Sequence, residues 1–113
     1  MTRLPLVLSV RFFRTEAGNE PVREWLAGLP REQRRLIGID IKTVQLGWPL
    51  GMPVVRKLEP GLWEVRTDLG DCIARVLFTL VGTDMLLLHG FIKKSQKTPS
   101  VELLTARLRK SRL

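Results

Sequence analysis

Residues 62–92 read LWEVRTDLGDCIARVLFTLVGTDMLLLHGFI, and this stretch decides the fold. Three runs rich in branched and aromatic residues, 62–67, 72–80 and 85–92, have the length and composition of β-strands. Two short segments that contain glycine, 68–71 and 81–84, separate these runs, as in β-hairpins. The pattern therefore predicts an antiparallel meander, with residues 54–58 as a short extension of its first strand.

Helical periodicity flanks this meander on both sides. After a first strand expected over 6–13, apolar spacing predicts helices over 21–28 and 31–46, and a last helix that begins at 98–100. The apolar faces of the two longer helices are Leu36, Ile37, Ile41 and Val44, and then Val101, Leu104 and Leu108. Such faces pack against a sheet, so we expect an α+β fold with a curved antiparallel sheet, in a single domain over 1–113.

The charge of the chain is high and unevenly placed. The 113 residues carry a formal net charge of +8. Residues 91–113 contribute +6 of this charge, and Glu102 is their only acid. This imbalance indicates a polyanionic partner for the C-terminal end, such as nucleic acid, a ribosome, an acidic protein or an anionic membrane surface.

Cysteine usage and the N-terminal residues point to a reducing compartment. Cys72 is the only cysteine, which excludes an internal disulfide and a CxxC metal pair. Because Cys72 falls in an apolar strand pattern, we expect a buried, inert thiol. The apolar run at 4–10 is too short to span a membrane and lacks a cleavage-site pattern. We therefore expect a soluble cytoplasmic protein that does not associate with a membrane.

Alternation along the strands assigns the charged side chains to faces of the sheet. One face of the last strand is expected to carry Met85, Leu87, His89, Phe91 and Lys93. An arginine inside a central strand must be paired or line a groove, because its burial is otherwise unfavourable. Two interpretations of Arg75 stay open. It pairs with Glu64 or Asp84, or it converges with Arg66 and Lys93 on one concave surface.

The last predicted strand runs into a cationic segment, HGFIKKSQKTP at 89–99. The segment combines a histidine, a phenylalanine and three lysines, and no acid lies between Asp84 and Glu102. Lysines attract phosphates and an aromatic ring stacks on a base, so the segment suits nucleic acid. A solvated loop with a satisfied histidine at the strand end is the simpler alternative.

Three motifs occur together: KLEPGLWEVR at 57–66, ARVLF at 74–78 and LLLHGFIKKSQKTP at 86–99. In this combination the chain resembles the RelE superfamily of toxins from type II toxin–antitoxin systems, in particular its HigB-type or phage Gp49-like branch. The resemblance implies a ribosome-dependent mRNA endonuclease that inhibits translation. It also implies a hetero-oligomer with a cognate helix-turn-helix antitoxin, and a fold with the element order expected above.

A metal-free reaction without a cofactor is the natural hypothesis, because no cluster of Asp, Glu, His or Cys has the spacing of a metal site. The 2′-hydroxyl would attack the adjacent phosphorus while cations stabilise the phosphorane. The resemblance implies that Arg66 and Arg75 supply this stabilisation. Lys93, Lys94 or His89 would act as acid or base. Many family members have a tyrosine near the site, whereas this chain has none, so the base stays open between His89 and the lysines.

The resemblance also implies contacts with RNA away from the reacting phosphate. Phe91 would stack on a base. The other RNA-binding candidates are Lys57, Lys97 and Arg107. Two alternatives to an endonuclease remain: a non-enzymatic module that binds nucleic acid or the ribosome, and an inactive phage-derived relative that serves only as a partner of another subunit.

Overall fold

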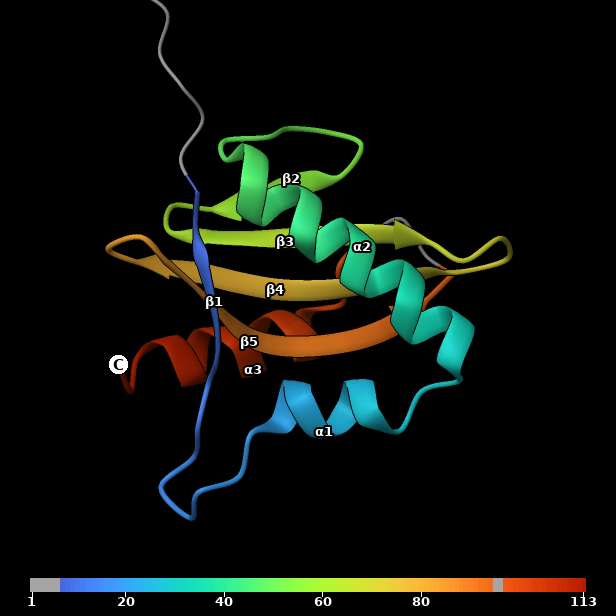
Figure 1. Cartoon of the computed structure of the whole chain (residues 1–113). Helices are drawn as coiled ribbons and strands as arrows, with labels where there is room; N and C mark the ends of the chain where they lie inside the picture. Colours follow the sequence, from blue (N-terminus) through green and yellow to red (C-terminus); the bar gives the residue numbers. More distant parts are fainter. Residues whose placement is uncertain (1–6, 95–96) are drawn as a thin grey trace, which may run out of the picture.

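The computed structural model describes residues 7–94 and 97–113, so the expected start of the first strand at residue 6 lies outside the described residues. The elements follow one another as shown in Figure 1. They are β1 (Ser9–Phe12), α1 (Pro21–Ala27), α2 (Arg31–Gly47), β2 (Val55–Glu59), β3 (Leu62–Asp68), β4 (Ile73–Val81), β5 (Asp84–Lys93) and α3 (Ser100–Lys110). In the described part of the chain, no helix is long and apolar enough to cross a membrane.

One sheet has the strand order β1-β5-β4-β3-β2. Strands β3 to β5 form the predicted antiparallel meander, which is confirmed. The expectation that residues 54–58 extend its first strand is wrong, because β2 is a separate strand that pairs antiparallel with β3 across the turn at Gly61. Strand β1 is added at the edge and runs parallel to β5. The three hairpin turns contain Gly61, Gly70 and Gly82 with φ values of 78°, 103° and 61°, a backbone conformation that favours glycine.

The helices cover the sheet from both sides (Figure 1), with α1 and α2 on one face and α3 on the other. The first face buries Ile37, Ile41 and Val44 of α2, as the periodicity predicts. The hydrophobic core on the α3 face is smaller. Its buried members are Phe13, Leu62, Leu77, Leu86, Leu88, Phe91 and Ala106.

A β-bulge interrupts the pairing of β4 with β5. Leu77 lies opposite His89 and Phe78 opposite Leu87, so Leu88 is an additional residue in β5. A bulge shifts the alternation of side chains by one position. One predicted same-face set is therefore wrong: Met85 and Leu87 belong to the core under α1 and α2, whereas His89 and Phe91 face α3.

Helix α3 uses a different face for packing than its apolar stripe suggests. Ala106 is buried and Leu103 is partly buried against the sheet. The stripe of Val101, Leu104 and Leu108 lies on the outer side instead, with 66%, 60% and 53% of these residues exposed. The stripe is thus formed as predicted, but it contributes little to the core.

Candidate functional site

Two arginines lie side by side on the α3 face of the sheet. Arg66 in β3 and Arg75 in β4 are directly opposite each other in the register. On the next strand, Phe91 lies opposite Arg75 and Lys93 lies opposite Ile73. Because paired residues project from the same face, the register confirms that Arg66, Arg75 and Lys93 share one face.

Glu64 joins the two guanidinium groups. Its Oε1 accepts a hydrogen bond from Arg66 Nη1 at 2.9 Å and lies 3.9 Å from Arg75 Nη1. The side chains of Glu64 and Arg75 have no exposed surface, and 7% of the Arg66 side chain is exposed. The predicted ion pair of Arg75 with Glu64 is confirmed. Asp84 instead pairs with Arg11 at 2.8 Å.

Thr98 connects this network to the start of α3. Its hydroxyl donates to Glu64 Oε2 at 2.7 Å and accepts from Arg75 Nη1 at 3.4 Å. A threonine next to a helix start often caps the helix, but Pro99 is the N-cap here and no side chain caps α3. The sequence therefore predicted a helix start at 98–100, but not that Thr98 binds the buried carboxylate.

Burial and neighbouring cations both lower the pKa of the Arg75 guanidinium. Burial is the main cause that lowers the pKa of Arg75, and the charges of Arg66 and Arg56 lower it further, while Glu64 opposes them. Arginine has so high an ordinary pKa that Arg75 remains charged near neutrality. The network thus holds a dehydrated guanidinium against a single carboxylate.

Arg56 is a cation near the site that the sequence analysis missed. It lies opposite Glu64 in the β2–β3 register, so it shares the face of the two arginines. The predicted RNA-binding residue Lys57 lies opposite Trp63, which packs against Trp48 in the core under α1 and α2. Lys57 is therefore on the other face. Alternation applied to residues 54–58 would have separated Arg56 from Lys57.

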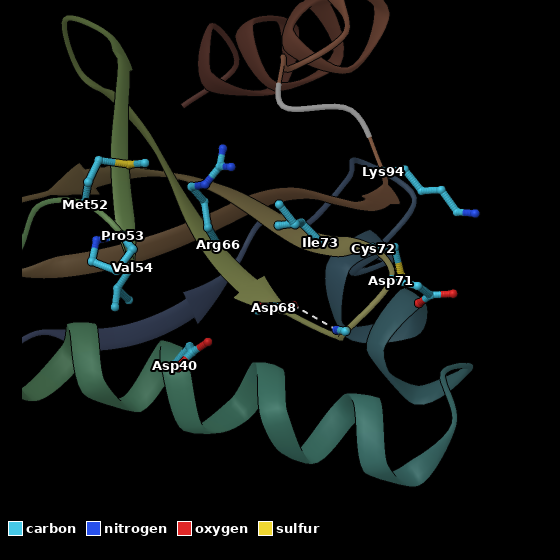
Figure 2. A pocket seen from close by; sticks show the side chains of 11 residues that line it. Asp40, Met52, Pro53, Val54, Arg66, Asp68, Asp71, Cys72, Ile73 and Lys94 are labelled. Atoms are coloured by element: carbon cyan, nitrogen blue, oxygen red, sulfur yellow. Dashed lines mark hydrogen bonds between the residues drawn. The ribbon is translucent and has the colours of Figure 1, made fainter.

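A pocket of about 680 Å³ opens beside Arg66 at the end of the β3–β4 hairpin. Figure 2 shows Arg66 directed towards α3, and Asp40 on α2 at the opposite side of the strand. The lining residues with ionisable groups are Arg66 and Lys94, together with Asp40, Asp68, Asp71 and Cys72. The pocket therefore combines two cations with three carboxylates, of which Asp40 lies on α2 and the other two lie at the end of the β3–β4 hairpin.

Cys72 lines this pocket and is half-buried, rather than buried as expected. Burial raises the pKa of the Cys72 thiol, and a hydrogen bond with Asp71 adds to the effect. A thiol that stays protonated is a weak nucleophile. The geometry supports the prediction of an inert cysteine.

His89 is engaged by α3 at both ring nitrogens. Nε2 lies 3.1 Å from Glu102 Oε1, and Arg109 Nη1 lies 3.3 Å from Nδ1. Arg109 also donates to the carbonyl of Leu88 at 2.8 Å. Since a guanidinium only donates, Nδ1 accepts and the ring proton sits on Nε2, facing Glu102. This geometry supports a satisfied histidine that holds α3, and it offers no ring nitrogen for a substrate.

Phe91 belongs to the core, which corrects the expectation that it stacks on a base. Only 6% of the residue is exposed. The guanidinium of Arg75 lies 5.9 Å from its ring centroid, and the His89 ring stacks on it at 5.8 Å. Helix α3 folds back over this part of β5, and strand alternation alone does not show that burial.

The remaining predicted cations lie in two separate places. Lys93, Lys94 and Lys97 are exposed at the end of β5 or after it, and Lys94 lines the pocket. Arg107 pairs with Glu59 at 2.7 Å, where α3 passes the end of β2. Ser95 and Gln96 of the quoted motif lie outside the described residues. Among residues 7–94 and 97–113, no group of three or more His, Cys, Asp or Glu could hold a metal ion.

Comparison with protein families covers most of this structure. The model of the family described as "Phage derived protein Gp49-like" matches residues 24–111, from α1 through α3. None of the curated proteins compared with the chain matches it. The matched region includes the arginine pair, its carboxylate and the lysines after β5. The chain therefore belongs to the phage-derived Gp49-like family, the HigB-like toxin branch of the RelE superfamily.

Proposed function

We propose that the chain is a toxin that cleaves ribosome-bound mRNA without a metal. Membership of its family indicates the toxin of a type II toxin–antitoxin system and implies a cognate antitoxin. Arginine and lysine side chains on the α3 face of the sheet would perform the reaction. A helix-turn-helix antitoxin would be the partner that silences the toxin.

One observation carries this proposal: two arginines lie in register on one face and share a buried carboxylate, and one of them, Arg66, lines a pocket. Cleavage through the 2′-hydroxyl builds negative charge on the phosphorane oxygens. Guanidinium groups that are already oriented in a site with little water stabilise such charge effectively. The Glu64 carboxylate fixes Arg66 before substrate binds.

The two arginines have different parts in the proposed reaction. Arg66 lines the pocket and contacts the phosphate. Arg75 has no exposed surface, so it acts through Glu64 and Arg66 as a positioning residue rather than by contact. The exposed Lys93, Lys94 and Lys97 attract the RNA backbone by charge.

The reaction forms one bond and breaks another. The 2′-oxygen bonds to phosphorus and the bond from phosphorus to the 5′-oxygen breaks, which yields a 2′,3′-cyclic phosphate and a 5′-hydroxyl. Lys94 lines the pocket, which supports it as the acid that protonates the 5′-oxygen. Lys93, on the face of the arginine pair, is the candidate that accepts the 2′ proton in its neutral form.

Replacing Arg66 tests the proposal. We expect the Arg66→Ala variant to relieve growth arrest on induced expression and to lower mRNA cleavage about 10²–10³-fold, the loss typical of a missing charge-stabilising donor. Lys57→Ala is the matched control, because it removes an exposed cation from the other face. Mapping of mRNA 5′ ends in translated regions measures both. Wild-type cleavage by Arg66→Ala, with its fold intact by circular dichroism, contradicts the proposal.

A non-enzymatic ribosome-binding toxin is the second candidate. The burial of Arg75 and the engagement of both nitrogens of His89 favour it, because these groups are already bound inside the protein. Such a toxin inhibits translation in a purified system while the mRNA remains intact. The same 5′-end mapping therefore separates the two candidates.

A further inference from the structure

The outer face of α3 carries a narrow apolar seam. Val101, Leu104 and Leu108 are each more than half exposed, although they sit on a well-formed helix. Their spacing of three and then four residues is that of the a and d positions of a heptad, which forms a seam for a second helix. Exposed apolar residues grouped in this way are typical of a protein interface.

Contacts on the inner face prevent α3 from turning this seam towards the sheet. Ala106 is buried against the sheet, Glu102 is bound to His89, and Arg109 donates to the carbonyl of Leu88. A rotation that buried the seam would break all three contacts. The seam therefore stays exposed in this fold.

The charges beside the seam define the chemistry of that chain. Arg107 lies beside the seam on α3, where it is exposed and pairs with Glu59, and the exposed Arg112 follows the end of the helix at Lys110. The acid of this helix, Glu102, is directed to His89 on the inner side. A second copy of the chain would oppose two positive flanks, which is unfavourable. Acidic flanks on the partner helix complement them.

We propose that this seam is the docking surface for an amphipathic, acidic helix of the antitoxin. The helix would place leucine or isoleucine side chains against Val101, Leu104 and Leu108, and its carboxylates beside Arg107 and Arg112. The proposal rests on the toxin family, which implies an antitoxin, and not on the cleavage reaction. Docking on α3 leaves the arginine pair on the sheet in place.

The test is binding of the purified chain to the protein encoded beside it. We expect the double variant Leu104→Glu, Leu108→Glu to weaken this complex at least about 30-fold, as for loss of central interface residues. Induced alone, the variant should still arrest growth like the wild type. The matched control is Ile39→Glu, Leu46→Glu, which places the same charges on α2 at residues that are 48% and 51% exposed. The control should bind normally.

The salt dependence of the complex tests whether the partner helix is acidic. Arg112→Glu should weaken the complex about tenfold at low salt and have less effect at high salt, since salt screens exposed charges. Val101→Gln, a milder change at the same seam, should weaken it without a change in circular dichroism.

Three results overturn the proposal. The first is wild-type binding by the Leu104→Glu, Leu108→Glu variant. The second is loss of binding by the α2 control instead. The third is a free chain that is a dimer and becomes a monomer in the seam variant, which would make a second copy the occupant. If the chain does not cleave mRNA, none of these three measurements changes. The docking proposal and the cleavage proposal can therefore fail separately.

Discussion

Glu64 is the residue on which the candidate site depends most. A fully buried carboxylate with two arginines is stabilised by those charges, and removing one member leaves a buried charge without its counterion. Arg75 cannot reach solvent to recover the lost hydration. The site is therefore also a structural element, and any effect of its variants on the proposed cleavage must be measured apart from their effect on stability.

The Glu64→Gln variant should be strongly destabilised. Loss of the carboxylate charge should lower the free energy of unfolding by about 3–5 kcal/mol, the range for breaking a buried ion pair. Thermal or urea unfolding measures this. Asp84→Asn is the control, because it breaks an exposed ion pair: the Asp84 side chain is 29% exposed and that of its partner Arg11 is 60% exposed. It should change the free energy of unfolding by about 1 kcal/mol or less. Equal losses in the two variants contradict the role of the buried network.

Cys72 should react slowly with alkylating agents. Burial and the hydrogen bond with Asp71 raise the pKa of the thiol, so a smaller fraction is thiolate at a given pH than in a free cysteine. The rate of iodoacetamide modification, followed by mass spectrometry, should stay below that of a model peptide from pH 7 to 9 and rise at higher pH. Asp71→Asn should shift the rate profile to lower pH. A rate equal to that of the peptide at pH 8 contradicts the raised pKa.

Residue positions were predictable from sequence where strand pairing is regular. Arg66 and Arg75 share a face because β3 and β4 pair without a bulge between these positions. The burial of Phe91 and the bond from Thr98 to Glu64 were not predictable, because both arise when α3 returns to the sheet. Such contacts join residues far apart in the chain and leave no local pattern.

At the scale of elements, the packing of α1 on β5 depends on the absence of a side chain. A Cβ atom on Gly90 would collide with the indole ring of Trp25. Gly90 therefore allows the helix to approach the strand closely. The residues around Gly90 indicate a cationic segment from sequence, whereas this glycine serves helix packing.

Gly90→Ala should destabilise the protein by about 1–3 kcal/mol, as expected for an overpacked contact. Gly38→Ala is the matched control: it lies inside α2, and its added Cβ would meet no atom within 4 Å. It should stabilise the protein by about 0.5–1 kcal/mol through helix propensity. Chemical unfolding of both variants measures the difference. Trp25→Leu replaces the indole ring with a smaller side chain, so it should reduce the destabilisation caused by Gly90→Ala. An unchanged destabilisation contradicts the proposed collision.

The order of elements followed from periodicity, with ends displaced by one or a few residues. Two features of the elements did not follow. The bulge at Leu88 reversed the expected faces within β5, because alternation assumes regular pairing. The apolar stripe on α3 faces outward, because periodicity identifies an apolar face and not what covers it.

At the scale of the whole molecule, the two proposed functions use different parts of the fold. The sheet holds the arginine pair with Lys93 on the same face, and the outer side of α3 presents an exposed apolar seam. The high positive charge suits both proposals, because RNA and an acidic helix are each polyanionic. On this account, the α3 apolar stripe contributes little to the core because it binds another chain.

The chemistry of the cut RNA ends tests the central claim most directly. Purified chain is added to a translating extract, and 5′ ends are sequenced with and without prior phosphorylation by polynucleotide kinase. The account predicts new ends inside translated regions that carry a 5′-hydroxyl, paired with 2′,3′-cyclic phosphates, and about 10²–10³-fold fewer of them with Arg66→Ala than with Lys57→Ala. Ends that carry a 5′-phosphate, or equal cleavage by the two variants, would contradict it.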